Sequence, residues 1–135
     1  MTTDNIEMWN IERITPYIRN PVVHPDTDVA KMAGLLTEFG CRPPLLIQRE
    51  GAIIVDGHLR YLAALKLGWD IIPVILCDNW THEQVKAYRI TSRNSATWAK
   101  WDEQLLELEV SELKNTNFNV DLLESLKRDL PYLLG

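Results

Sequence analysis

Two kinds of apolar pattern alternate along the chain: short, mostly apolar runs, typical of buried strands, and spaced positions, typical of helices. The runs lie at residues 45–49, 52–56 and 69–77. Apolar residues three and four positions apart predict helices near residues 26–39, 58–67, 81–95, 102–114 and 120–130. The pattern therefore predicts an α+β fold, in which a small mixed β-sheet packs against helices and a helical tail follows at the C-terminus.

Prolines refine the predicted strands. Three prolines between residues 11 and 25 fix φ and push their predecessors toward extended geometry, so this region is predicted to be the first extended segment. The run at residues 52–56, which a tight turn joins to the preceding run, is apolar enough to be a central strand. Pro73 predicts an edge position or a bulge for the strand at residues 69–77.

Capping residues fix several of the predicted helix ends. Asp26 or Thr27 can cap the first helix, because their side chains accept hydrogen bonds from unpaired N–H groups. Thr81 and Gln84 have the spacing of a capping box. Gly40 ends the first helix, and Gly68 supplies the left-handed residue that commonly ends a helix.

Size and charge indicate one core with an acidic appendage. The chain has 135 residues, 46% of them hydrophobic, which is enough for one compact domain. Its formal net charge of -5 excludes a protein that coats nucleic acid over its whole surface. Residues 1–100 carry 11 basic and 11 acidic side chains, whereas residues 101–135 carry 3 and 8. We therefore expect a domain over 1–100 and an acidic helical tail over 101–135 that packs on or extends it.

Neither the termini nor the cysteines point to secretion or metal binding. Every apolar run is far shorter than the roughly 18 residues that span a bilayer, and the first residues lack the features of a signal peptide. A cytoplasmic protein without a membrane partner is the expectation. Cys41 and Cys77 lie 36 positions apart, which indicates neither a disulfide framework nor a zinc site, and both are predicted to be small buried side chains.

Candidate chemistry is concentrated where the strand at residues 52–56 runs through Gly57 into a helix. Such a helix start presents unpaired N–H groups and a partial positive charge, and glycine lets a phosphate approach closely. Arg60 can bind phosphate oxygens, His58 can transfer a proton or make a hydrogen bond, and Asp56 can act as a base or metal ligand. The alternative is that Asp56 only caps the helix and that His58 and Arg60 are solvated.

A second candidate is the basic segment at residues 86–100, which contains no acidic residue. It carries four cationic side chains with two aromatic residues between them, namely Lys86, Arg89, Arg93 and Lys100 with Tyr88 and Trp98. Such interleaving can stack on and neutralise nucleic acid. An ordinary solvated helix face explains the charges equally well.

Several motifs carry a family resemblance. They are Thr15-Pro16-Tyr17-Ile18-Arg19-Asn20-Pro21, Glu38-Phe39-Gly40, Pro44-Leu45-Leu46-Ile47, Ile54-Val55-Asp56-Gly57-His58-Leu59-Arg60 and Thr81-His82-Glu83-Gln84. In residues, order and spacing the chain resembles the ParB/sulfiredoxin superfamily over roughly residues 11–125, in its ParB-like nuclease domain branch. It is most similar to the version found at the N-terminus of phage and bacterial DNA modification methylases.

The resemblance implies a phosphate or nucleotide pocket built from three places. Its residues would be Gly40 and Arg42 in the loop after the first helix, Gly57, His58 and Arg60 at the start of the second, and Arg89, Arg93 and Asn94 on the third. Departures at the second of these places restrict what is carried over. His58 and Leu59 replace the Glu and first Arg of partition ParB proteins, which argues against CTP-dependent switching. His58 also replaces the reactive Cys of sulfiredoxins, which argues against peroxiredoxin repair.

Three functions remain open on the sequence. The leading hypothesis is a protein of phage or plasmid DNA metabolism or modification that binds phosphate of DNA or nucleotide, with nuclease activity if a divalent metal (Mg or Mn) binds at Asp56, and with Glu38 and Asp78 as further carboxylates. The second is a phosphotransferase or NTPase of the free serine kinase type that uses ATP or CTP. The third is a non-catalytic module whose helical tail binds a protein partner such as a DNA methylase.

Overall fold

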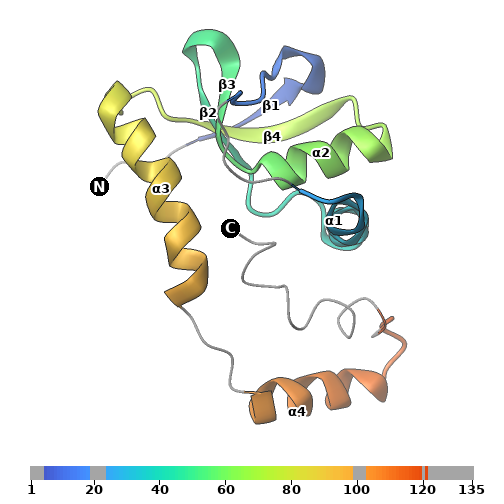
Figure 1. The fold of residues 1–135 in the computed structure, drawn as a ribbon. Coiled ribbons are helices and arrows are strands. Elements are labelled where there is room, and N and C mark those ends of the chain that lie inside the picture. Colours follow the sequence, from blue (N-terminus) through green and yellow to red (C-terminus); the bar gives the residue numbers. More distant parts are fainter. Residues whose placement is uncertain (1–4, 19–23, 99–102, 120, 122–135) are drawn as a thin grey trace.

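The computed structural model describes residues 5–18, 24–98, 103–119 and 121, which contain one four-stranded sheet and four α-helices (Figure 1). The strands are β1 (Ile6–Asn10), β2 (Leu45–Gln48), β3 (Ile53–Asp56) and β4 (Ile71–Leu76). The helices are α1 (Asp26–Phe39), α2 (His58–Leu67), α3 (His82–Trp98) and α4 (Glu103–Lys114), with 3-10 turns η1 (Ile11–Arg13) and η2 (Glu50–Ala52). The predicted α+β fold is confirmed.

The sheet has the order β1-β4-β2-β3 and is mixed, because β2 runs parallel to β4 while the other two pairs are antiparallel. The prediction for the first strand was wrong in position. β1 precedes the proline-rich region, which instead contributes η1 and one isolated parallel bridge from Thr15 to Ile53. Ile6 and Met8 are exposed, so β1 lacks the buried apolar run by which the other strands were found.

The predicted places of β3 and β4 in the sheet are also corrected. β4 lies between β1 and β2, whereas β3 is the last strand, and among the described residues only Thr15 pairs with its outer side by backbone hydrogen bonds. Ile11 donates its backbone N–H to the carbonyl of Asp70 over 2.9 Å. Because bonded and non-bonded pairs alternate along an antiparallel ladder, the Met8–Pro73 pair is a non-bonded one. The missing N–H of Pro73 therefore costs no hydrogen bond between β1 and β4. Pairing of β4 with β2 begins at the following residue, Val74.

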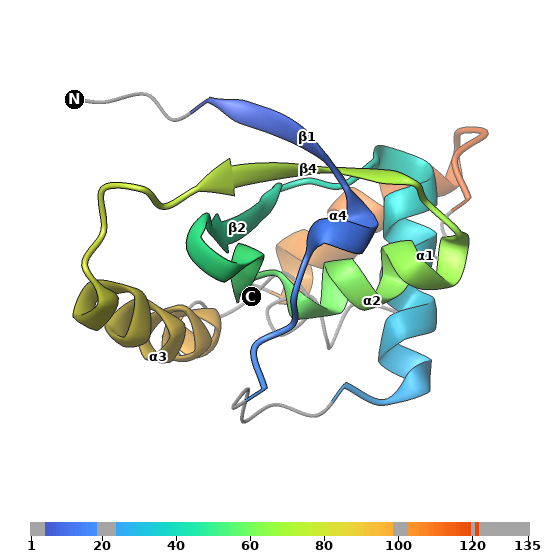
Figure 2. The ribbon, with the colours of Figure 1, turned by 90° about the horizontal axis from the view of Figure 1, so that it is seen from above.

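Helices cover the two faces of the sheet unequally. Ile54 belongs to the larger core cluster together with buried residues of α1 and α2, whereas Val55 belongs to a second cluster with Cys77 of the β4–α3 connection and Val85 of α3. Neighbouring strand residues point to opposite faces, so α1 and α2 lie on one face and α3 on the other. Figure 2 shows α1 and α2 close together and α3 apart from them. Helices rather than neighbouring strands bury β3, which explains its apolar sequence at an edge.

The helix ends follow the sequence with two exceptions, at the start of α1 and the end of α3. Thr81 and Gln84 form the predicted capping box, with N–H to side-chain oxygen distances of 2.7 and 3.1 Å. Pro25, and not Asp26 or Thr27, is the N-cap of α1, and it makes no side-chain capping bond. α3 continues to Trp98, a few residues beyond its predicted end near Ser95.

The acidic tail begins with α4, whose 12 residues make the predicted three turns. After α4, the ring of Phe118 stacks on Phe39 at the end of α1, with 6.3 Å between the centroids. The predicted helix at residues 120–130 lies almost wholly outside the described residues, and the division at residue 100 stays a prediction. In the described part of the chain, no helix has the length and apolar character that crossing a membrane requires.

Candidate phosphate-binding site

Gly57 shapes the turn by which β3 enters α2. Its φ of 107° lies in the left-handed region, and a Cβ here would lie 2.5 Å from Leu45 Cδ2 and 3.1 Å from Arg60 Nη2. Gly57 is the N-cap of α2 and makes no side-chain capping bond, while its carbonyl accepts the N–H of Tyr61 over 2.9 Å. The N–H groups of the first turn consequently have no intrahelical partners. Asp56 is therefore not the N-cap of α2, contrary to the alternative interpretation given above.

Arg60 is the most unusual side chain of the site. Its residue is only 2% exposed, and it is the one buried charged residue among those described. Nη2 donates to the carbonyl oxygen of Pro44 at 3.5 Å, a long bond, whereas Nε and Nη1 have no hydrogen-bond partner in the described part of the chain. Because burying a cation with so few hydrogen-bond partners is costly, a guanidinium held this way is well suited to bind an anion. The interpretation of Arg60 as a solvated residue was wrong.

The loop after α1 contributes a thiol rather than the predicted cation. Burial raises the pKa of Cys41, while the neighbouring guanidinium of Arg60 partly opposes that shift, so the thiol is protonated at neutral pH. Arg42 is exposed and donates from Nε to the carbonyl oxygen of Phe39 over 3.0 Å, which caps the end of α1. The N–H of Gly40 donates to Leu36 and is likewise engaged. The predicted phosphate-binding roles of Arg42 and Gly40 are therefore not supported by the geometry.

His58 and Arg89 meet at Tyr17 on the other side of the α2 start. The backbone N–H of Tyr17 donates to His58 Nε2 over 3.1 Å, so this nitrogen is an acceptor and is not available to donate a proton. Arg89 lies with Cζ 3.6 Å from the Tyr17 ring centroid, and its Nη2 donates to the Ile54 carbonyl oxygen over 2.9 Å. Burial lowers the pKa of Arg89, and Tyr17 partly opposes the change. Both residues lie near the start of α2, as predicted. Their contacts hold Tyr17 and strand β3 in position there.

Tyr88 is a further residue of the site, and the sequence pointed only to its aromatic character. Burial raises the pKa of its phenol most, the charge of Asp56 raises it further, and the charge of Arg60 lowers it. The ring also packs against Trp80, with 4.9 Å between the centroids. Tyr88 therefore couples electrostatically to both the carboxylate and the guanidinium. Its position next to Arg89 on α3 is the only sequence signal that could have placed it here.

No family model matches the chain. It is 36% identical over 74 residues to the ParB-like nuclease domain-containing protein YnaK of Escherichia coli, a match that covers 55% of this chain and 84% of that protein. This chain belongs to the ParB-like nuclease domain family.

Solved structures of more distant proteins show the same fold. The chromosome-partitioning protein ParB of Caulobacter crescentus, in complex with CTP-gamma-S, superimposes with a TM-score of 0.68 at 20% identity, over 81% of this chain and 62% of that one. The same protein on the centromeric parS site gives 0.55 at 17% identity, over 84% and 62%. Sulfiredoxin of Arabidopsis thaliana gives 0.52 at 19% identity, over 62% and 96%. The chain thus has the ParB/sulfiredoxin fold and spans less than two thirds of that ParB structure.

The predicted metal site receives no support from the arrangement of this ParB-like domain. Among the residues described, no group of three or more His, Cys, Asp and Glu side chains is close enough to hold a metal ion. Arg93 and Asn94 continue α3 beyond Arg89, but their side chains lie outside the described part. Lys86 is exposed. The role of this basic segment stays a prediction.

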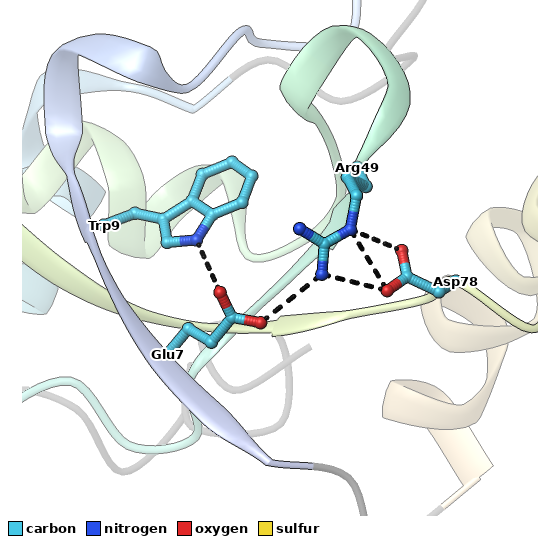
Figure 3. Close-up of polar contacts among 4 residues, drawn as sticks. All are labelled: Glu7, Trp9, Arg49 and Asp78. Atoms are coloured by element: carbon cyan, nitrogen blue, oxygen red, sulfur yellow. Dashed lines mark hydrogen bonds and ion pairs between the residues drawn. The ribbon is translucent and has the colours of Figure 1, made fainter.

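Asp78, considered above as a metal ligand, belongs instead to an exposed polar cluster (Figure 3). Its carboxylate accepts from Nε and Nη2 of Arg49 at 3.1 to 3.2 Å, and Nη2 also lies 3.5 Å from Glu7. Glu7 in turn accepts the Nε1–H of Trp9 over 3.3 Å. The cluster connects β1 to the β2–β3 turn and to the loop after β4. Its contacts are exposed ion pairs and hydrogen bonds, which support the surface structure and contribute little stability.

Proposed function

We propose that this ParB-like domain binds the phosphate end of a nucleotide at the start of α2, with Arg60 as the principal ligand of the anion. The observation that carries the proposal is the buried guanidinium of Arg60, which has Nε and Nη1 without partners. Beside it, the first turn of α2 offers unpaired N–H groups and the positive end of the helix dipole. A phosphate placed between them would pair with both.

Burial favours a free nucleotide over duplex DNA as the ligand. Only 2% of Arg60 is exposed, so the phosphate of a DNA backbone, flanked by sugars on both sides, has little access to its guanidinium. The terminal phosphate of a nucleotide is smaller and can enter end-on. The complex of the Caulobacter ParB with CTP-gamma-S supports a nucleotide ligand, and its complex with parS keeps DNA as the second candidate.

The other residues of the site have supporting roles in this proposal. Gly57 allows the ligand to approach the backbone, and Cys41 and Pro44 border the guanidinium as uncharged groups. His58 and Arg89 hold Tyr17 and the β3 edge in place, so their removal would loosen the site rather than remove a ligand. Arg93 and Asn94 remain the proposed contacts to the rest of the nucleotide.

Catalysis would require one more group. Asp56 at the end of β3 is the proposed base, or the proposed ligand of a divalent metal, for either nuclease or phosphotransferase activity. A role in phage or plasmid DNA modification, with a methylase bound through the tail, is compatible with binding alone. Incubation of the protein and of an Asp56→Asn variant with supercoiled DNA, and then with nucleoside triphosphates, with and without Mg or Mn, separates nicking from phosphate release.

Calorimetric titration with CTP, ATP, inorganic phosphate and a short DNA duplex tests the binding proposal. Arg60→Ala should weaken nucleotide binding about 10- to 150-fold, since a hydrogen bond to a charged group contributes about 1.5–3 kcal/mol. Arg60→Lys should fall in between, because it keeps the charge and loses the planar fork. Lys66→Ala is the matched control, as it removes one exposed charge from the last turn of the same helix.

Thermal unfolding without ligand shows whether each variant is folded before it is titrated. Unchanged nucleotide affinity in folded Arg60→Ala, or equal losses in Arg60→Ala and Lys66→Ala, would contradict the assignment of Arg60. Binding of the duplex alone, with loss in Arg60→Ala, would keep the phosphate site and replace the nucleotide by DNA.

A further inference from the structure

The outer edge of β1 is open for pairing. β1 is the first strand of the sheet and pairs only with β4, and no other described segment pairs with its outer side (Figure 2). The strand contains neither proline nor lysine, the residues by which natural proteins commonly protect such an edge. Ile6 and Met8 are 59% and 56% exposed, so the edge is also apolar on one face.

The hydrogen bonds to β4 determine which backbone groups of β1 are free. Ile11 and Asp70 form a bonded pair, and bonded pairs alternate with non-bonded ones. Glu7 and Trp9 therefore direct their N–H and C=O groups toward β4, whereas Ile6, Met8 and Asn10 direct theirs outward. These three outward residues can accept an antiparallel strand.

We propose that two copies of this chain associate through antiparallel pairing of their β1 edges, which joins two four-stranded sheets into one continuous sheet. One register pairs all three outward residues. It places Met8 opposite Met8 of the second copy on a two-fold axis, and Ile6 opposite Asn10 at each end. Each of these three pairs exchanges two backbone hydrogen bonds.

Charge favours a second copy as the occupant of this edge. In the same register, Glu7 lies opposite Trp9 of the second copy, whose ring is covered by the guanidinium of Arg13 with Cζ 3.9 Å from the centroid. Each Glu7 would thus lie opposite the Trp9–Arg13 pair of the second copy instead of the other Glu7. Arg49, 3.5 Å from Glu7, further limits the repulsion between the two carboxylates. On the opposite face, the side chains at the axis are uncharged.

Cysteine cross-linking tests the register. In Met8→Cys the two introduced residues would lie in a directly opposed pair, with Cα atoms about 5.5 Å apart, which a disulfide can bridge. In the matched variant Ile6→Cys the two residues would lie four positions apart along the ladder, roughly 13 Å, which is too far. Cys41 and Cys77 are both buried and should not interfere. Under mild oxidation we expect a covalent dimer from Met8→Cys only, and equal cross-linking of both variants would overturn the register.

Sedimentation across a wide range of protein concentration tests the association itself. The unmodified chain should show a reversible monomer–dimer equilibrium. Met8→Lys should weaken it by about tenfold or more, because two like charges would then face each other at the axis. Ile71→Lys is the control, since Ile71 is 53% exposed on the same face but lies on β4. A monomer at every concentration, or an equal effect of both lysines, would refute pairing through the β1 edge.

Discussion

Replacing Gly57 with alanine tests the close packing at the start of α2. The added Cβ would meet Leu45 Cδ2 at 2.5 Å, a distance at which one of the two groups must move. Leu45 is fully buried, so its side chain would have to shift within the packed core. The φ of 107° adds a second penalty, because residues with a Cβ rarely adopt it. We therefore expect Gly57→Ala to destabilise the protein through both effects.

The two penalties can be estimated separately. Left-handed geometry costs a non-glycine residue about 1–2 kcal/mol, and forcing an extra methyl group into a packed core costs about 1–3 kcal/mol. Their sum predicts a loss of about 2–5 kcal/mol in the free energy of unfolding. For a chain of this size that corresponds to a decrease in Tm on the order of 10 °C. Denaturant titration and thermal melting measure the two quantities.

Gly68→Ala is the matched control. Gly68 has a φ of 76° at the other end of α2, and a Cβ there would meet nothing within 4 Å. It should lose only the conformational part, about 1–2 kcal/mol. If the two variants lose the same stability, the contact with Leu45 is unimportant and the packing argument for Gly57 is refuted.

Two further predictions concern local interactions. Thr81→Ala removes half of the capping box and should lower the free energy of unfolding, measured by denaturant titration, by about 1 kcal/mol. The control Thr91→Ala removes an exposed hydroxyl from the same helix and should change the free energy of unfolding by no more than about 0.5 kcal/mol. Burial raises the pKa of Cys41 above its ordinary value of 9.0, so the native state holds a proton that the unfolded chain releases. The stability from this effect is present below pH 9.0 and is lost as the pH rises further, and the free energy of unfolding should therefore fall less steeply above pH 9.0 in Cys41→Ala than in the unmodified chain. An equal slope in both proteins would show that the Cys41 thiol contributes nothing to the alkaline loss.

Local sequence was sufficient for most helices and for the key turn. Helical spacing, the Thr81–Gln84 box and the glycines after α1 and α2 act over a few residues, and the structure contains all of them. The run of β3 into Gly57 and α2 was predicted for the same reason. A phosphate-binding turn is a local backbone geometry, and a glycine between a strand and a helix is its signal.

Longer-range features escaped the pattern. β1 pairs with β4 from more than sixty positions away, and its exposed side chains give no periodic signal. The His58 side chain accepts the N–H of Tyr17 from 41 positions away, so its predicted proton-donating role could be judged only in three dimensions. The position of Arg42 in the sequence suggested phosphate binding. In the structure its guanidinium instead donates to the carbonyl oxygen of Phe39 at the end of α1.

The sequence by itself predicted most helices of this ParB-like domain and the turn at Gly57 where we propose that an anion binds, because both depend on neighbours along the chain. The tertiary structure decided which cation is available there. Four arginines and a histidine were candidates, and packing engages Arg42, Arg89 and His58 with backbone groups while it buries Arg60 with two nitrogens unpaired. The side chain of the fourth arginine, Arg93, lies outside the described residues. Burial and hydrogen-bond partners come from segments far apart in the chain, and for that reason no local pattern could rank these residues.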